Sequence, residues 1–532
     1  MAQKSTSLVA RDTSLDNSKI EDKTKENKDV EHHPHKLSRP ISSFLAHSSA
    51  QQSSRGLWAA IYIISASLSL FARLIGIGFS DKGNTPVFDE KHYAPQAFQM
   101  LFIPGHQESF PGYGLVVHPP LGKTLISFGE KIFGYTPLGW RAASIVTGVL
   151  IVLMLMRIIH IITGNITAVI FTAIIANMEG TQLFMSRIAM LDVFMAFFIT
   201  AMAFCIVKDI TTDTTYTPWH KRGWLLLSGV CAGLAMAVKL SGAFYAAFMG
   251  VALVVIVACT SKSIRETLKA LGMGLVFYLV IPLTIFLLSW VPWFANENSV
   301  YRHVAESGDI EHPLPEWIAN ILPDSLNSFA SYQIGVAQFH TGLKSGPGID
   351  NFHPWESKPE LWFLGARPML FLNTPADKED VIFGSGAGEA KLMLCANMAV
   401  WVLIIPVILW GLYKMISKKS PEWCVIISGF AIGIIPWFIT HDRQQYFFYT
   451  VSWSMFIVLG ISLMFYEIAQ IINKKKKLSY QSSLNVMYIP YAVIVAVVFV
   501  IYLPWLYNIP ASDAYHNGLT LLSSWEQFKG YQ

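Results

Sequence analysis

Long apolar stretches separated by shorter polar ones dominate the pattern of this 532-residue chain. A helix needs about 20 mainly apolar residues to cross the hydrocarbon core of a bilayer. Eleven stretches approach or meet that length, at about 57–79, 140–162, 165–180, 188–207, 223–238, 241–259, 270–290, 391–412, 421–440, 444–466 and 485–508. The pattern predicts an all-α polytopic membrane protein with about 11 transmembrane helices.

Two polar stretches are much longer than the others, at about 80–139 and 291–389. Part of the first has helical periodicity, with apolar residues on one side and polar residues on the other. The apolar side holds Leu121, Leu125, Phe128 and Ile132, and the polar side holds Lys123, Ser127, Glu130 and Lys131. This amphipathic helix is too short to span, so we expect it to lie in the membrane interface.

The distribution of lysine and arginine predicts the orientation in the membrane. With an odd number of spans, the two termini face opposite sides. The short loops on the side of the N-terminus carry Arg157, Lys208, Lys221, Arg222, Lys262, Arg265, Lys269, Lys414, Lys418, Lys419 and the run Lys474 to Lys477. Positive charge favours the cytoplasmic side. We therefore expect a cytoplasmic N-terminus and two extracytoplasmic long loops.

The ends of the chain are polar. Residues 1–55 have few apolar side chains to bury and predict a disordered cytoplasmic tail. A membrane domain at 56–510 follows, and residues 511–532 form a short extracytoplasmic tail.

Composition supports the membrane class and excludes others. The chain is 53% hydrophobic and 14% charged, with a mean hydropathy of +0.43, whereas soluble domains carry about 25% charge. A net charge of +4 gives no case for nucleic acid. The five cysteines lie in or beside apolar segments without paired spacing, which indicates packing rather than disulfides or a metal site.

The candidate chemistry lies just beyond the first span, where Asp89 and Glu90 are adjacent. His118 and Lys123 follow in the same loop, and Arg141 begins the second span. Carboxylates and cations at a membrane boundary suit polar chemistry on a lipid-borne substrate. Taken alone, the acidic pair is equally explained as the N-terminal cap of a helix. Arg73 in the first span either reaches the interface or pairs inside the bundle.

An ordered set of motifs across about residues 57–510 resembles the protein O-mannosyltransferases. The motifs are Val87-Phe88-Asp89-Glu90, His118-Pro119-Pro120-Leu121-Gly122-Lys123, Arg187 with Met190-Leu191-Asp192, Lys239-Leu240-Ser241-Gly242, His353 to Pro359, Arg367-Pro368, and Arg443 before Tyr446-Phe447-Phe448-Tyr449. Leu240 and the pair Gln444-Gln445 depart from residues common in the family, which affects only local details of the pocket.

The resemblance implies a glycosyltransferase of family 39 with the GT-C fold, which uses a lipid-phosphate sugar outside the cytoplasm. The second long loop has no room for the β-trefoil domain of eukaryotic members, so the chain is similar to the bacterial, actinobacterial-type branch. The implied donor is polyprenyl-phosphate mannose. The implied acceptors are Ser and Thr hydroxyls of exported proteins, with the Sec machinery as a candidate for delivery, at the bacterial plasma membrane.

Family position assigns the general base to Asp89, with Glu90 orienting the acceptor or supporting Asp89. Cations must stabilise the leaving phosphate. The candidates on the donor side are Arg141, Lys123, Arg187 and Lys239, with His118 beside them. Candidates for the acceptor or second-loop site are His353, Arg367 and Arg443. For each cation, a structural ion pair remains an alternative, and for each histidine a purely structural turn does.

Metal-ligand spacing is missing from the sequence, so we expect no obligatory metal, although Asp89, Glu90 and His118 could ligate a divalent cation. Two other functions stay open. One is a GT-C glycosyltransferase with a lipid acceptor, and the other is a secondary transporter, although its charges would lie near the bilayer midplane.

Overall fold

The computed structural model describes residues 55–80, 84–102, 116–212, 222–260, 263–345, 355–476 and 479–520. The predicted site residue His353 lies outside these ranges, as does all but the last residue of the predicted tail at 1–55. The described residues belong to the unit Ser54–Gln532.

Every apolar stretch expected to span contains a helix. Eight helical segments are long and apolar enough to cross a membrane: Arg55–Leu74, Pro137–Thr163, Leu191–Thr211, Ile264–Ala295, Met398–Lys418, Pro421–Ile439, Phe447–Lys475 and Tyr480–Tyr507. Three shorter apolar helices, Ile166–Met178, Gly223–Val238 and Gly242–Val254, match the remaining stretches. The helical membrane fold is therefore confirmed, and the number of crossings stays a prediction.

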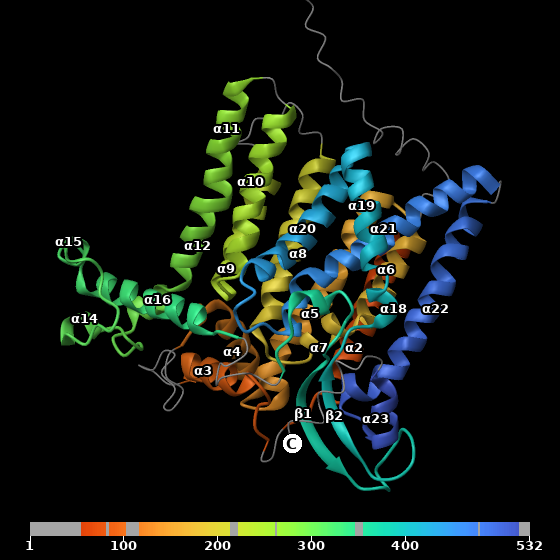
Figure 1. Cartoon of the computed structure of the whole chain (residues 1–532), viewed down its shortest axis with the longest axis horizontal. Coiled ribbons are helices and arrows are strands. Elements are labelled where there is room, and N and C mark those ends of the chain that lie inside the picture. The colour runs from red at the N-terminus through yellow and green to blue at the C-terminus, as the bar shows by residue number, and fades with distance from the viewer. Residues whose placement is uncertain are drawn as a thin grey trace, which may run out of the picture. The chain divides into compact units, whose positions relative to one another are not determined.

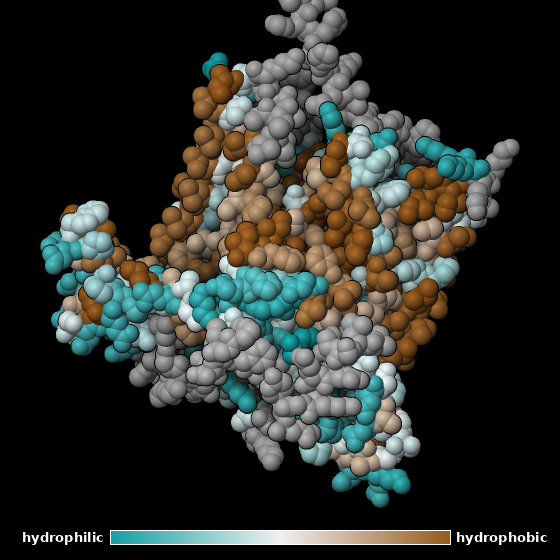
Figure 2. Space-filling view, in the orientation of Figure 1, coloured by the Kyte–Doolittle hydropathy of each residue, from teal (hydrophilic) through white to brown (hydrophobic). Residues whose placement is uncertain are grey.

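The bundle is built from α2 (Arg55–Leu74), α5 (Pro137–Thr163), α6 (Ile166–Met178), α8 (Leu191–Thr211), α9 (Gly223–Val238), α10 (Gly242–Thr260), α11 (Ile264–Leu275), η2 (Val276–Val280), α12 (Ile281–Ser289), α18 (Met398–Trp401), α19 (Ile404–Lys418), α20 (Pro421–Ile439), η3 (Phe447–Thr450), α21 (Val451–Lys476) and α22 (Tyr480–Tyr507). Hydrophobic side chains gather over α11, α12 and α22 in Figure 2, as lipid contact requires.

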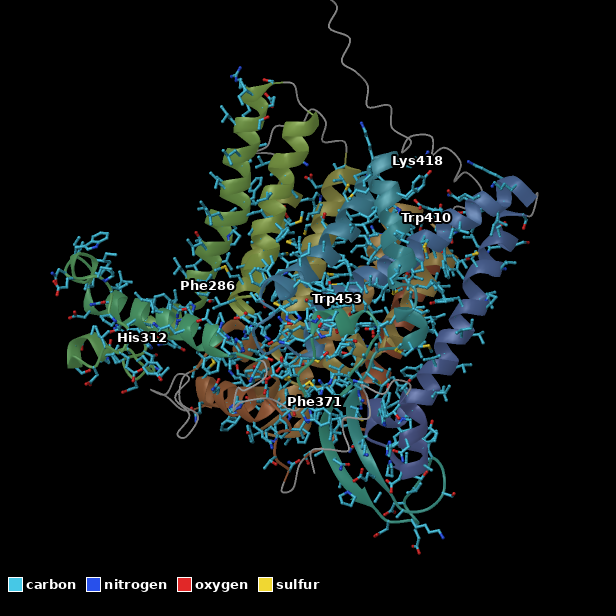
Figure 3. The ribbon with its side chains drawn as sticks, in the orientation of Figure 1. Phe286, His312, Phe371, Trp410, Lys418 and Trp453 are labelled. Atoms are coloured by element: carbon cyan, nitrogen blue, oxygen red, sulfur yellow. The ribbon has the colours of Figure 1, made fainter. Side chains whose placement is uncertain are left out.

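The remaining helices belong to the connections. They are α3 (Glu90–Phe102), α4 (Leu121–Phe133), α7 (Gly180–Met185), α13 (Val291–Ala295), α14 (Val304–Ser307), α15 (Glu316–Ala319), α16 (Asp324–Gly342), α17 (Pro359–Trp362) and α23 (Asp513–Leu519). Figure 1 shows α3, α4 and α16 at the same end of the bundle as a β-hairpin. Phe371 of that hairpin lies at the opposite end from Lys418 of the basic loops (Figure 3).

A small antiparallel sheet adds to the expected all-α fold. Its strands are β1 (Met369–Ala376), β2 (Gly388–Leu394) and β3 (Pro510–Ser512), in the order β1-β2-β3. The sequence did not predict it, because β1 is apolar in its first half and exposed from Asn373 onward, so it lacks the alternation of a half-buried strand. The residues expected as a C-terminal tail begin with the end of β3 and with α23.

The predicted amphipathic helix is α4, but its sides are covered differently from those of a simple interfacial helix. Phe128 and Ile132 on the apolar side are 54% and 72% exposed, whereas Leu121 and Leu125 on the same side pack partly buried against the core. The polar residues Lys123, Ser127 and Glu130 are buried against the protein. This arrangement leaves Phe128 and Ile132 free to contact lipid.

Close approach of α4 to α5 explains this burial. A Cβ on Gly129 of α4 would lie 2.4 Å from the carbonyl oxygen of Gly139 in α5. Thr136 caps α5, since its hydroxyl accepts from the Gly139 amide, and Pro137 opens the first turn. The hairpin of the two helices therefore depends on glycine at their contact.

Arg73 pairs inside the bundle rather than reaching the interface. Its Nε donates to the Ser186 hydroxyl at 2.7 Å, and its Nη1 donates to the Ser69 hydroxyl at 2.7 Å and to Asn177 Oδ1 at 2.8 Å. These contacts satisfy a charge that would otherwise be costly in the membrane.

A separate aromatic cluster seats α16 on the end of the bundle. Trp290 and Trp293 pack against Phe329 and Tyr332 of α16. The Tyr332 hydroxyl also donates to the carbonyl of Val116 at 2.6 Å. The second long loop is thus fixed to the segment that leads into His118-Pro119-Pro120.

Candidate active site

The acidic motif sits in a strained turn between α2 and α3. Phe88 has a φ of 49°, which is rare for a bulky residue and is typical of functional sites. Its ring contacts Phe371 of β1 and Phe448, with centroids 4.6 Å and 6.2 Å apart. These contacts hold the turn that sends the two following carboxylates in different directions.

Glu90 faces the protein interior and is completely buried. Its Oε1 accepts from Arg141 Nε and from the Ala189 amide, both at 2.7 Å. Its Oε2 accepts from Arg141 Nη2 at 2.6 Å and from the Val87 amide at 3.2 Å. A carboxylate with four donors has no room for an acceptor substrate, so Glu90 fixes the motif in place.

Asp89 keeps part of its surface accessible and accepts a hydrogen bond from Tyr93, one helical turn onward. Burial raises the pKa of the Asp89 carboxyl to about 6, and the nearby charge of Asp192 adds to that rise. Lys239 and Tyr93 oppose it. Asp89 is therefore ionised at neutral pH and basic enough to take a proton.

Lys239 is a cation within electrostatic range of Asp89. It follows α9, and its Nζ forms an ion pair with Asp192 of α8 at 2.8 Å. Its Nζ also lies 5.1 Å from the centre of the Tyr449 ring. The Asp192 carboxylate thus holds the Lys239 ammonium group near the Asp89 carboxylate.

Two histidines and an arginine form the other side of the site. The His118 and His340 rings stack with centroids 5.4 Å apart, and Tyr93 lies 5.9 Å from His118. Burial and the charges of Lys239 and Arg443 lower the pKa of His118 well below its usual value. His118 Nδ1 and Arg443 Nε are buried, and neither has a hydrogen-bond partner among the described residues.

A pocket opens beside Lys239. Its lining includes Asp192 and Met195 of α8, Phe244 and Tyr245 of α10, Trp437 of α20, and Tyr449. The lining therefore combines charged and hydroxyl groups with aromatic rings.

The structure brings Asp89, His118, Lys239 and Arg443 together, since each lies within electrostatic range of another member. Arg141 lies elsewhere, and its described contacts are Glu90 and the carbonyls of Ile77 and Phe79. This geometry favours a structural role for Arg141.

Three other candidates are also held by protein groups. Arg187 is buried and donates to the Leu506 and Ile75 carbonyls. Lys123 is fully buried, and its Nζ lies 3.2 Å from the His118 carbonyl. Arg367 lies between α17 and β1 with a φ of 62°, four residues before Phe371.

Sequence reasoning missed three residues of the cluster. Tyr93 could have been predicted from the sequence, because it lies four residues after Asp89 on the same helical face. Asp192 was part of a motif but was not paired with Lys239. His340 gave no signal, because nothing in the sequence distinguishes it from the other histidines of the second loop.

A metal site is a separate question. Among the ranges that the structure describes, no group of three or more His, Cys, Asp or Glu side chains is placed to hold a metal ion. Asp89 and Glu90 point to different partners, so the two do not form a shared site with His118.

Comparison with known proteins gives consistent matches along the chain. Residues 136–295 match the family profile described as dolichyl-phosphate-mannose-protein mannosyltransferase. Residues 325–525 match the C-terminal four-transmembrane region of protein O-mannosyltransferase. The fold is similar to a chain of the S. cerevisiae protein O-mannosyltransferase Pmt1-Pmt2 complex bound to the sugar donor, with a TM-score of 0.66, 14% identity and coverage of 92% of this chain and 97% of that one.

Bacterial relatives are closer in sequence. The polyprenol-phosphate-mannose–protein mannosyltransferase of Corynebacterium glutamicum is 34% identical over 502 residues, which cover 88% of this chain and 93% of the relative. The protein of the same name from Mycolicibacterium smegmatis is 35% identical over 494 residues, with the same coverage. The chain therefore belongs to the polyprenol-phosphate-mannose–protein mannosyltransferase family and is a multi-pass membrane protein.

Proposed function

We propose that this enzyme transfers mannose from polyprenyl-phosphate mannose to Ser and Thr hydroxyls of proteins. The observation that carries the proposal is Asp89, a partly accessible carboxylate with a raised pKa that lies beside Lys239. The names of the relatives supply the donor and the class of acceptor. The site supplies a base and cations in the arrangement that this transfer needs.

In the proposed reaction, Asp89 accepts the proton of the acceptor hydroxyl as its oxygen attacks the anomeric carbon. The bond from that carbon to the phosphate oxygen breaks, and the polyprenyl phosphate leaves with the electron pair. A phosphate leaves without a proton, so a second carboxylic acid is not required, and attack in a single step inverts the anomeric configuration. A positioned base of this kind contributes about 10²- to 10⁴-fold.

Lys239 and Arg443 are the proposed contacts of the donor phosphate. Lys239 keeps 13% of its side chain exposed and lines the pocket. The Nε of Arg443 has no described partner. Such a donor can form a strong charge-assisted hydrogen bond to a phosphate oxygen. His118 Nδ1 is a second buried nitrogen without a described partner, and it suits contact with a sugar hydroxyl.

Several finer expectations remain part of the proposal. The N-terminus lies in the cytoplasm and the site lies outside it, as the basic loops at the opposite end of the bundle from Phe371 suggest. His353 and Arg367 contribute to the acceptor side of the site in the second loop. The Sec machinery delivers the acceptor proteins, and the reaction requires no divalent metal.

A mass-shift assay tests the proposal. Purified enzyme in detergent receives polyprenyl-phosphate mannose and a Ser/Thr-rich peptide, with and without a chelator. We expect the peptide to gain one hexose both with and without the chelator. Asp89→Asn should lower the rate at least about 10²-fold. Asp309→Asn, which changes an exposed carboxylate of the second loop, should keep the normal rate. A folded enzyme that consumes donor but mannosylates only lipid would overturn the acceptor class, and loss of activity with chelator would overturn metal independence.

A further inference from the structure

His340, near the end of α16, joins two segments of the site that are far apart in the sequence. Its Nε2 lies 3.0 Å from the Val117 carbonyl, and its Nδ1 lies 3.2 Å from Arg443 Nη2. A carbonyl oxygen only accepts, so Nε2 must carry the proton. Arginine only donates, so Nδ1 must be unprotonated. The two partners together select one neutral tautomer of the ring.

The neutral state is also favoured by the surroundings of the ring. Burial, together with the charges of Arg443 and Lys239, lowers the pKa of His340 to about 4, although the hydrogen bond to Val117 opposes these effects. At neutral pH the ring therefore offers Arg443 a lone pair. The ring does not add a third positive charge to the site.

The Arg443 guanidinium is oriented by few protein groups. Its Nη2 is bound by His340, its carbon lies 5.8 Å from the centre of the Trp437 ring, and its Nε has no described partner. If Arg443 formed an ion pair with a protein carboxylate, its strong donors would be occupied within the protein. A histidine lone pair holds one nitrogen and leaves the charge unneutralised for an anion.

The hydrogen bond between His340 Nε2 and the Val117 carbonyl fixes the position of the His340 ring. Val117 immediately precedes His118, whose ring stacks on His340, and Val116 is held by Tyr332 of the same helix. The segment 116–118 is therefore attached to α16 at two successive carbonyls. Because His340 also binds Arg443, the His118 segment and the Arg443 guanidinium are both positioned by this one helix.

We propose that His340 is a positioning residue, which aims the Arg443 guanidinium at the donor phosphate and sets its distance from the His118 segment. This inference rests on the assignment of Arg443 to the donor phosphate in the proposed function. His340 itself does not touch the reacting atoms. It acts by restricting the Arg443 guanidinium to orientations that can bind the donor phosphate.

Two substitutions separate its hydrogen bonds from its packing. His340→Phe keeps a ring against His118 but removes both nitrogens, and we expect it to raise the donor KM about tenfold, the value of one lost bond to a charged group, with a smaller effect on kcat. His340→Asn places an amide oxygen near the position of Nδ1, and we expect it to recover most of the donor KM. His303→Phe changes an exposed histidine of the same loop and serves as the control.

A double-mutant cycle with Arg443→Ala decides the mechanism. If His340 acts through Arg443, His340→Phe has no further effect on donor KM in the Arg443→Ala background. An equal effect in both backgrounds would overturn the inference, because it would show a general structural role.

The two proposals fail in different ways. If Arg443→Ala raises donor KM but His340→Phe does not, the positioning role is wrong and the phosphate assignment stands. If Arg443→Ala leaves donor KM unchanged in folded enzyme, the phosphate assignment is wrong and the inference fails with it. Thermal unfolding of each variant in detergent establishes that it is folded.

Discussion

Arg141 and Glu90 form an ion pair with two parallel hydrogen bonds, and neither side chain has any exposed surface. The pair connects the first residue of α3 to the fifth residue of α5 across 51 residues of sequence. It therefore determines where Asp89, the neighbour of Glu90, is presented. Arg141, one of the candidates for the donor phosphate, thus supports the acidic motif instead.

This pairing predicts a stability effect for Arg141→Gln. The change leaves the buried Glu90 without its counter-charge, which typically costs about 3–5 kcal/mol. We expect a large fall in the unfolding temperature in detergent. Adding Glu90→Gln should restore part of the stability, because no buried charge then remains. A stable Arg141→Gln enzyme with a raised donor KM would instead support phosphate contact by Arg141.

The pKa of Asp89 predicts the acidic side of the activity profile. A general base works only when ionised, so kcat/KM should fall about tenfold per pH unit below the pKa of about 6 and be flat above it. Asp192 raises this pKa by its negative charge. In Asp192→Asn, the fall in kcat/KM should therefore begin at a lower pH. The kcat/KM of both enzymes measured from pH 4.5 to 8 tests this, and an unshifted profile in Asp192→Asn would contradict the assignment of the base.

Glu130 predicts a pH effect on stability that is separate from activity. Its carboxylate is buried in α4 without a described partner, and burial raises its pKa to about 8 from an ordinary value of 4.5. The folded protein therefore holds a proton that the unfolded chain releases above pH 4.5, so its contribution to stability is lost as pH rises toward 8. Glu130→Gln should match the wild type in unfolding temperature near pH 4.5 and exceed it at pH 8. Parallel unfolding curves of the two proteins at all pH values would refute this.

Gly148 predicts the result of a one-carbon change in the bundle. A Cβ there would lie 2.4 Å from Arg73 Nε and 2.3 Å from Ser186 Cβ, the two partners of a buried hydrogen bond. Gly148→Ala should cost about 1–3 kcal/mol by overpacking. Gly272→Ala is the matched control, since nothing lies within 4 Å of its Cβ position. Equal unfolding temperatures for both variants would show that Arg73 moves freely.

The features that depend on local sequence were predictable from composition and periodicity. Apolar length predicted the positions of the membrane helices, and the spacing of Leu121, Leu125, Phe128 and Ile132 predicted α4. The ordered motifs predicted the family, and they are the basis for the proposal of Asp89 as the base. These features depend on composition and periodicity, which a single sequence displays.

Pairing between distant segments was not predictable in the same way. Lys239 pairs with Asp192 across 47 residues, and His340 with Arg443 across 103. The sequence did not separate the basic candidates for the site, because the hydrogen-bond partners of Arg141 and Arg187 are brought to them only by packing. β1 was missed because its partner strands are set by tertiary contacts rather than by its own pattern.

The short strand β3 has a consequence for biosynthesis. It pairs with β2 through Gly388, Glu389 and Ala390, and β2 holds the strand whose Phe371 supports Phe88. Residues 510–512 follow α22, so β3 can pair with β2 only after α22 has been synthesised. A nascent chain that already contains β1 and β2 therefore lacks one strand of this sheet, and the support of Phe88 is completed only after the described membrane helices have been made.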